Sequence, residues 1–263
     1  MTATSRMLAD RSRRRFLARA GVALAAGLAG GVRIIDLPQA KAQVQAGAAS
    51  AAAAASGPVT GARRWAMLVD TARCASGCDA CVRACDAEHG LRGHGRPATD
   101  ARWIRKVTVR DRASGRETSL PLMCQHCTHP PCVDVCPTGA SFRRADGIVL
   151  VDKHTCIGCR YCMLACPYKA RSFIHENLTD QKPWSPRGKG TVESCNLCVH
   201  RIDAGDARGP ACAEACAREG HRAIVFGDLN DPASDIASAA REHESRELRS
   251  DLELDTGVRY RNL

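Results

Sequence analysis

The sequence predicts an α+β protein with short helices, β-hairpins and little regular secondary structure. Three observations lead to this prediction. Only 4% of the 263 residues are aromatic, so few large side chains are available to build a core. The strand signals are short and are separated by turn residues. Sixteen cysteines fall into four groups of four, which indicates that the cysteines organise the interior of the fold.

Residues 1–42 have the three parts of an export signal. A basic segment, Ser12-Arg13-Arg14-Arg15-Phe16-Leu17, precedes an apolar stretch at 20–32 and the small residues Ala40 and Ala42, which flank Lys41. The paired arginines favour a twin-arginine signal over an ordinary Sec signal, and the twin-arginine route exports folded proteins. The apolar stretch is too short to span a bilayer, which takes ~20 residues. We therefore expect a periplasmic protein with no transmembrane helix of its own, associated peripherally with the membrane.

The remaining chain divides by composition. Residues 43–62 are rich in Ala and carry interrupting Gly and Pro residues, which predicts a flexible linker rather than an Ala-rich helix. A folded domain is expected over 63–228, followed by a C-terminal helix and tail over 229–263.

Local patterns predict the elements of the folded part in order. Short apolar runs predict strands at 65–69, 171–175 and 223–226. Alternating residues and turn signals predict two hairpins, one with arms 103–110 and 117–122, the other with arms 141–144 and 148–151 around Asp146-Gly147. Residues 232–249 predict a polar surface helix with Pro232 near its start.

Charge and motifs exclude several function classes. The formal net charge is +10, but residues 1–42 contribute +6 of it and the other basic residues are scattered, which does not favour a nucleic-acid partner. No nucleophile–base pair, phosphate loop or dinucleotide fingerprint is present. We therefore expect no catalytic residue in this chain, which is not predicted to be an enzyme alone.

The four cysteine groups have the spacing of iron–sulfur ligands. Their members are Cys74, Cys78, Cys81 and Cys85 (group one); Cys124, Cys127, Cys132 and Cys136 (group two); Cys156, Cys159, Cys162 and Cys166 (group three); and Cys195, Cys198, Cys212 and Cys216 (group four). Two or three intervening residues let a loop direct three thiolates at one cluster, while the fourth thiol reaches a second cluster. The repeated spacing makes this signal specific.

Three alternatives fit the cysteines less well. Closely spaced thiols suit cross-links between distant segments poorly, which argues against disulfides. Structural zinc sites take two separated pairs of ligands rather than three thiols in seven residues. The spacing of Cys74, Cys78 and Cys81 also matches radical enzymes that use S-adenosylmethionine, but too few residues remain for their catalytic barrel.

Three stretches carry a family resemblance: LPLMCQHCTHPPCVDVCPTGASFRRADGIVLVDKHTCIGCRYCMLACPYKARSF, VESCNLCVHRI and AIVFGDLNDP. The chain resembles the ferredoxin-like iron–sulfur electron-transfer subunits of membrane oxidoreductases, a family that includes the polysulfide and tetrathionate reductase subunits and the NrfC and DsrO groups. The long first group and the twin-arginine signal resemble most the DsrO group of the Dsr transmembrane complex. The resemblance implies two bacterial-ferredoxin-like lobes, with groups one and four in the first and groups two and three in the second.

The same resemblance implies four [4Fe-4S] clusters with ligands exchanged between groups. The implied ligand sets are set one (Cys74, Cys78, Cys81, Cys216), set two (Cys85, Cys195, Cys198, Cys212), set three (Cys124, Cys127, Cys132, Cys166) and set four (Cys136, Cys156, Cys159, Cys162). One departure from the family pattern lies after Cys216, where Ala217 replaces the usual proline. The resemblance therefore does not predict the local turn there.

The expected function is electron transfer. As the resemblance implies, the partners are a quinone-reactive membrane subunit of the NrfD or DsrP type, together with a haem c or catalytic subunit, in Dsr-type sulfur metabolism. Two alternatives remain open: a subunit of a periplasmic molybdopterin reductase or of nitrite reduction, and a soluble periplasmic electron shuttle.

Overall fold

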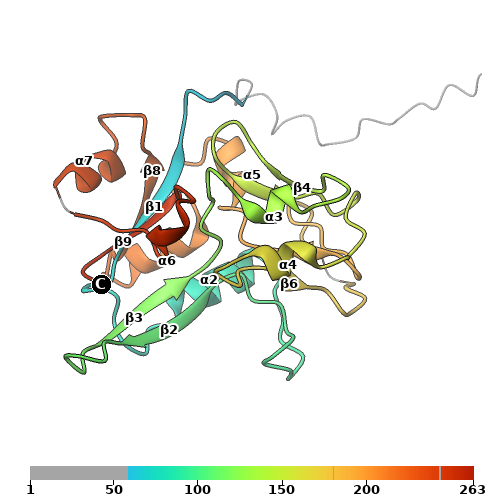
Figure 1. Cartoon of the computed structure of the whole chain (residues 1–263), viewed down its shortest axis with the longest axis horizontal. Coiled ribbons are helices and arrows are strands. Elements are labelled where there is room, and N and C mark those ends of the chain that lie inside the picture. Colours follow the sequence, from blue (N-terminus) through green and yellow to red (C-terminus); the bar gives the residue numbers. More distant parts are fainter. Residues whose placement is uncertain (1–58, 180, 243) are drawn as a thin grey trace, which may run out of the picture. The chain divides into compact units, whose positions relative to one another are not determined.

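The computed structural model describes residues 59–179, 181–242 and 244–263 (Figure 1). The predicted signal peptide, 1–42, and the predicted linker up to residue 58 lie outside the described residues, and both stay predictions. Residues 59–62 belong to no helix or strand. The described part combines short helices with small sheets, which confirms the predicted α+β class.

A three-stranded sheet has the strand order β8-β1-β9. Its central strand β1, Trp65–Asp70, pairs antiparallel with β8, Ile224–Asp228, and parallel with β9, Val258–Arg261 (Figure 1). Because β1 has a neighbour on each edge and both faces covered, it reads as a continuous apolar run rather than an alternating one. The predicted strands at 65–69 and 223–226 are confirmed, whereas β9 was not predicted.

The two faces of β1 contact different clusters of buried side chains. Met67 and Val69 belong to the main core, whereas Ala66 and Leu68 pack with Ile236 in a smaller cluster. This division follows the two-residue period of a strand. Both faces are therefore covered.

The predicted helix over 232–249 is wrong in length. Helix α7 spans only Asp235–Glu242, and it begins where the hydroxyl of Ser234 accepts a hydrogen bond from the N–H of Ala237. Beyond the helix the chain returns to the sheet, because Arg246 and Tyr260 exchange two backbone hydrogen bonds. The helix is also less polar than predicted, since it buries Ile236 against β1.

The other strands form three two-stranded antiparallel sheets. These are β2 (Arg105–Arg110) with β3 (Glu117–Leu122), β4 (Ser141–Arg143) with β5 (Val149–Val151), and β6 (Ser172–Phe173) with β7 (Val192–Glu193). Both predicted hairpins are confirmed. The first hairpin begins two residues later than predicted, because Trp103 and Ile104 are buried outside the ladder. The strand predicted at 171–175 is β6, which is only two residues long.

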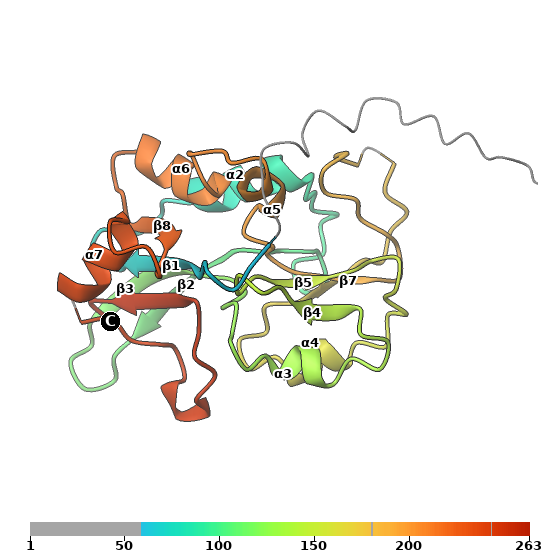
Figure 2. The same ribbon diagram turned by 90° about the horizontal axis from the view of Figure 1, so that it is seen from above.

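Short helices carry or follow the cysteines. They are α2 (Ala80–His89), α3 (Pro131–Asp134), α4 (Tyr161–Ala165), α5 (Val199–Asp203) and α6 (Ala211–Arg218), whereas the 3-10 turn η1 (Ser250–Leu252) lies between α7 and β9. Helix α2 packs against α6, and α3 packs against α4 (Figure 2). Segments of groups one and four are thereby adjacent, as are segments of groups two and three. Helix α6 continues through Ala217, which explains why no proline follows Cys216.

Thiols form a large part of the core. Eleven of the sixteen cysteines are buried, and ten of these belong to the main cluster together with Trp103, Tyr260 and Met67. All sixteen lie in the described residues and none forms a disulfide. The interior therefore depends on what the thiols bind as well as on apolar contacts.

One fully buried ion pair joins the loop before β7 to β7 itself, and its guanidinium also bonds the loop after α2. Arg187 donates to both carboxylate oxygens of Glu193 at 2.9 and 2.7 Å and to the carbonyl of Gly90 at 2.7 Å. Replacing Glu193 by Gln leaves this guanidinium buried without its counter-charge, so we expect a loss of about 3–5 kcal/mol. The measurement is the denaturant midpoint of the anaerobically purified protein.

The matched control is Glu244→Gln, which removes the partner of Arg246 at the surface, where both side chains are more than 70% exposed. Exposed pairs contribute about 0–1 kcal/mol, so this midpoint should barely move. Equal effects of the two changes would contradict the prediction.

Candidate cluster-binding sites

The four thiols of set one line a common cavity. Three of them stand on the loop after β1 and at the start of α2, whereas Cys216 comes from α6. Apolar residues such as Pro121 and Ile224 complete the lining, together with Lys106. Burial raises the pKa of Cys81 to about 11, and the other thiols of the set add to the shift while Lys106 opposes it. The packing of α2 on α6 thus brings distant parts of the sequence to one site.

The four thiols of set three line a second cavity. Its wall also includes Pro130, Pro131, Tyr168 and Arg171. Burial raises the pKa of Cys124 to about 12, opposed by the cation of Arg171. Both cavities therefore combine four thiols, apolar walls and one cationic side chain.

The thiols of set two are all buried and influence one another. Burial raises the pKa of Cys85, and the three other thiols of the set raise it further. Cys85 comes from α2 and Cys212 from α6, the same helix pair that builds set one.

Set four is the most exposed of the sets. Burial raises the pKa of Cys162, opposed by Arg171, and Cys156 and Cys136 contribute to the rise. Cys159 is exposed, two residues before the start of α4. Three thiols of this set are therefore neighbours, and the fourth lies at the surface.

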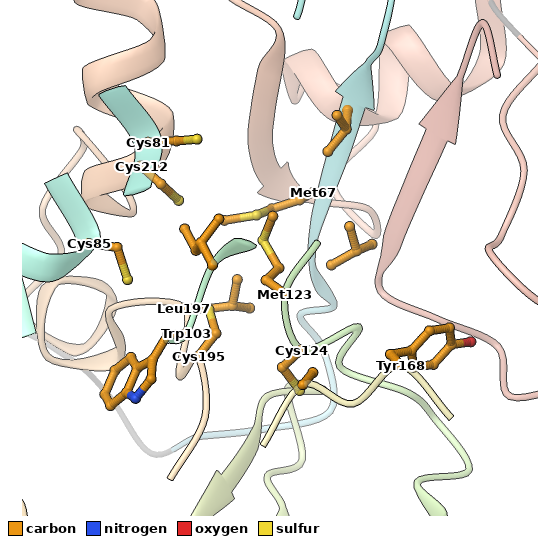
Figure 3. Packing of buried hydrophobic residues seen from close by; sticks show 14 of the residues in the cluster. Met67, Cys81, Cys85, Trp103, Met123, Cys124, Tyr168, Cys195, Leu197 and Cys212 are labelled. Atoms are coloured by element: carbon orange, nitrogen blue, oxygen red, sulfur yellow. The ribbon is translucent and has the colours of Figure 1, made fainter. Parts of the chain in front are cut away.

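The four sets follow one another in a row. Burial is the main reason that the pKa of Cys212, Cys195 and Cys162 rises, but a thiol of a neighbouring set adds to each rise: Cys81 acts on Cys212, Cys124 on Cys195, and Cys132 on Cys162. These interactions link set one to two, two to three and three to four. Figure 3 shows the first part of the row, from Cys81 through Cys212, Cys85 and Cys195 to Cys124.

Exposure varies along this row. Every thiol of sets two and three is buried, whereas Cys74 and Cys78 of set one are half-buried. Set four has two half-buried thiols and one exposed thiol. The two ends of the row are therefore closer to solvent than its middle.

Each group uses the same backbone turn. The residue before the second cysteine has a positive φ in all four groups: Gly77 (79°), His126 (46°), Gly158 (70°) and Leu197 (55°). Glycine adopts this conformation freely, whereas a residue with a Cβ atom is strained there by about 1–2 kcal/mol. Such strain persists only where the surrounding structure enforces it. In groups one and two the first three thiols of the loop that contains this residue line one cavity.

Backbone N–H groups donate to several thiols. The donors are Ser141 to Cys136 at 3.3 Å, Ala170 to Cys166 at 3.5 Å, Val192 to Cys156 at 3.4 Å, Ala211 to Cys198 at 3.5 Å and Ala223 to Cys216 at 3.2 Å. A hydrogen bond to sulfur favours the thiolate form, which is the form that binds iron.

Three polar side chains also reach the thiols. Lys106 donates to Cys74 at 2.9 Å, Arg171 donates to Cys132 at 3.0 Å, and His89 Nε2 lies 3.3 Å from Cys198 Sγ. The roles of Lys106 and His89 were missed from the sequence, because each lies more than 30 residues from the cysteine that it contacts. Burial lowers the pKa of His89 to about 3, so its imidazole is neutral.

The donor sets fit a polynuclear cluster. Within the described ranges, no three His, Cys, Asp or Glu side chains converge closely enough to hold a single metal ion. Four thiols instead surround a cavity in sets one and three. A [4Fe-4S] cluster takes four cysteine ligands spread over its corners, so these residues suit that group better than a mononuclear zinc ion.

An α+β fold with such thiol sites defines an iron–sulfur protein, and comparison with known proteins agrees. The model of a 4Fe-4S dicluster domain matches residues 117–228, which include groups two, three and four. The chain is 42% identical over 226 residues to the Hdr-like menaquinol oxidoreductase iron–sulfur subunit 1 of Archaeoglobus fulgidus, covering 76% of this chain and 84% of that protein.

Two further relatives belong to bacteria. The tetrathionate reductase B-subunit of Salmonella typhimurium is 40% identical over 182 residues, which cover 68% of this chain and 64% of that protein. Protein NrfC of Escherichia coli is 38% identical over 187 residues, covering 68% and 72%. The chain belongs to this family of ferredoxin-like iron–sulfur subunits, which transfer electrons in oxidoreductase complexes and do not carry the catalytic site. In the part of the chain that the structure describes, no helix combines the length and apolarity needed to cross a bilayer.

Proposed function

We propose that the chain holds four [4Fe-4S] clusters, one on each thiol set, and relays electrons between a quinone-reactive membrane subunit and its redox partners in Dsr-type sulfur metabolism. The observation that carries this proposal is the row of thiol sets, buried in the middle and closer to solvent at both ends. Electrons then enter and leave at sets one and four, where partners can approach.

The side chains prepare each site for this task. A bound [4Fe-4S] cluster supplies a group that takes up and releases one electron. The thiolates hold it, the backbone N–H groups stabilise their negative charge, and the apolar walls exclude water. Thiols of neighbouring sets influence one another's pKa, which supports neighbouring clusters near enough for direct electron transfer.

The helix pairs support a division into two bacterial-ferredoxin-like lobes. Packing of α2 on α6 accompanies sets one and two, and packing of α3 on α4 accompanies sets three and four. Each lobe then holds two clusters with exchanged ligands.

The partners and the location rest on the sequence and the relatives. One relative is named for menaquinol, which favours a quinone-reactive partner, and the paired arginines of 1–42 favour export of the folded holoprotein to the periplasm, where it associates peripherally with the membrane. The relative named for tetrathionate reductase supports the alternative of a reductase subunit with a catalytic partner. Copurification with a membrane subunit favours the first assignment, whereas recovery only from the soluble periplasm favours a shuttle.

Iron and acid-labile sulfide analysis tests the cluster number. We expect about 16 irons and about 16 sulfides per chain after anaerobic purification, since four clusters hold four of each. A protein with only two clusters would give about 8 irons, and a content near that value would overturn the proposal.

A further inference from the structure

Arg171 is a buried cation beside the cavity of set three. It follows Cys166 by five residues and stands just before β6, with 5% of its surface exposed. Its Nη2 donates to Cys132 Sγ at 3.0 Å, and its side chain forms part of the cavity wall.

Two of its remaining donors have no partner. Nε and Nη1 of Arg171 are both buried and make no hydrogen bond to any described residue. Each such donor costs free energy unless something else satisfies it. An unpaired donor on the wall of a thiol-lined cavity is therefore available to whatever the cavity binds.

The counter-charge of Arg171 differs from that of the other buried arginine. Arg187 is equally buried but makes a bidentate pair with Glu193. Arg171 forms no ion pair with a carboxylate of the described residues. Burial of a guanidinium without a counter-charge costs several kcal/mol, so its compensation has to come from sulfur.

Thiols of two sets supply that compensation. Burial lowers the pKa of Arg171, but Cys132, Cys124 and Cys162 more than reverse the effect and leave the pKa raised. Cys132 and Cys124 belong to set three, whereas Cys162 belongs to set four. The geometry agrees: Arg171 bonds Cys132 on α3, and α3 packs against α4, which carries Cys162, so the guanidinium lies beside both sites.

We propose that Arg171 is a positioning residue that tunes the third and fourth cluster sites together, by placing one fixed positive charge and the N–H groups of two unpartnered nitrogens, Nε and Nη1, beside them. This inference rests on the proposed function, because it requires clusters at both sites. A reduced cluster carries one more negative charge than an oxidised one, so a nearby cation favours reduction. The charge thus raises the midpoint potentials of both sites.

The test is an EPR-monitored redox titration of the anaerobic holoprotein and its variants. In Arg171→Met, we expect two of the midpoints to fall, with at least a tenfold lower ratio of reduced to oxidised cluster at a fixed potential, or ~59 mV for one electron. Arg171→Lys keeps the charge and should keep both midpoints near those of the unmodified protein. Wild-type iron content with unmoved midpoints in Arg171→Met would overturn the proposal.

Lys106→Met is the matched control, since Lys106 contacts Cys74 of set one. Lys106→Met should shift a midpoint potential that Arg171→Met does not change. If Lys106→Met instead shifts the same two midpoints, the assignment of Arg171 to sets three and four is wrong. If Arg171→Met loses iron, Arg171→Lys decides: retained iron with unshifted midpoints supports the role of charge, and equal loss of iron refutes it. A failure of the proposed function looks different, because the unmodified protein itself would then hold fewer than about 16 irons.

Discussion

Removal of iron from the anaerobically purified protein is expected to abolish its cooperative unfolding transition. Eleven buried thiols lie in or beside the main core, and the chain offers few large apolar side chains in their place. Binding of a structural metal such as zinc contributes about 10–16 kcal/mol, which matches or exceeds the usual stability of a whole domain, about 5–15 kcal/mol. Without iron, the apolar contacts around β1 are too few to hold the fold.

The measurement is a thermal scan by far-UV circular dichroism after anaerobic treatment with a chelator. Protein treated with the same chelator already saturated with iron is the control and should keep its transition. A sharp transition that survives the loss of nearly all iron would show that the core is stable on its own.

Serine replacements are expected to show which cysteines share a cluster. Cys216→Ser should disturb the site of Cys81, because both thiols line the cavity of set one although they stand far apart in the sequence. If the affected cluster is lost, each single variant lacks about 4 of about 16 irons. The double variant Cys81→Ser/Cys216→Ser should then lack the same irons, since both changes remove one cluster.

The matched pair of changes is Cys212→Ser/Cys216→Ser. These two cysteines lie on the same helix, α6, but belong to sets two and one. Their losses should add to about 8 irons, because independent sites contribute additively. Iron analysis of the purified variants distinguishes the two patterns. The reverse result, a loss of about 8 irons in the first double variant and only about 4 in the second, would show that each group binds its own cluster.

Much of the secondary structure follows from local signals. Asp146-Gly147 marks a hairpin because its turn needs a positive φ, and the structure has φ 92° at Gly147. Strand β9 has no such local signal, because its short segment has only two apolar side chains. It forms a strand only by pairing with β1, which lies near the other end of the folded part of the sequence. The helix predicted over 232–249 was too long because the pairing of Arg246 with Tyr260 is a tertiary contact that local propensity does not contain.

The candidate sites were predictable to a similar degree. Cysteine spacing identifies the ligands, since it reflects a local turn that the four groups share. The family resemblance is confirmed by the relatives, whereas the division into four sets stays a prediction that the cavities support. The side chains that contact the thiols from distant segments, such as Lys106 and His89, depend on packing and carry no signal in the sequence alone.

The graded exposure along the row also sets an order of oxidative damage. Dioxygen reaches a site through solvent, so Cys159 and its set meet it first, while the buried middle is shielded by the protein. In air the protein would then lose the cluster of set four before those of sets two and three. A preparation would stay brown while no longer transferring electrons to the partner at that end.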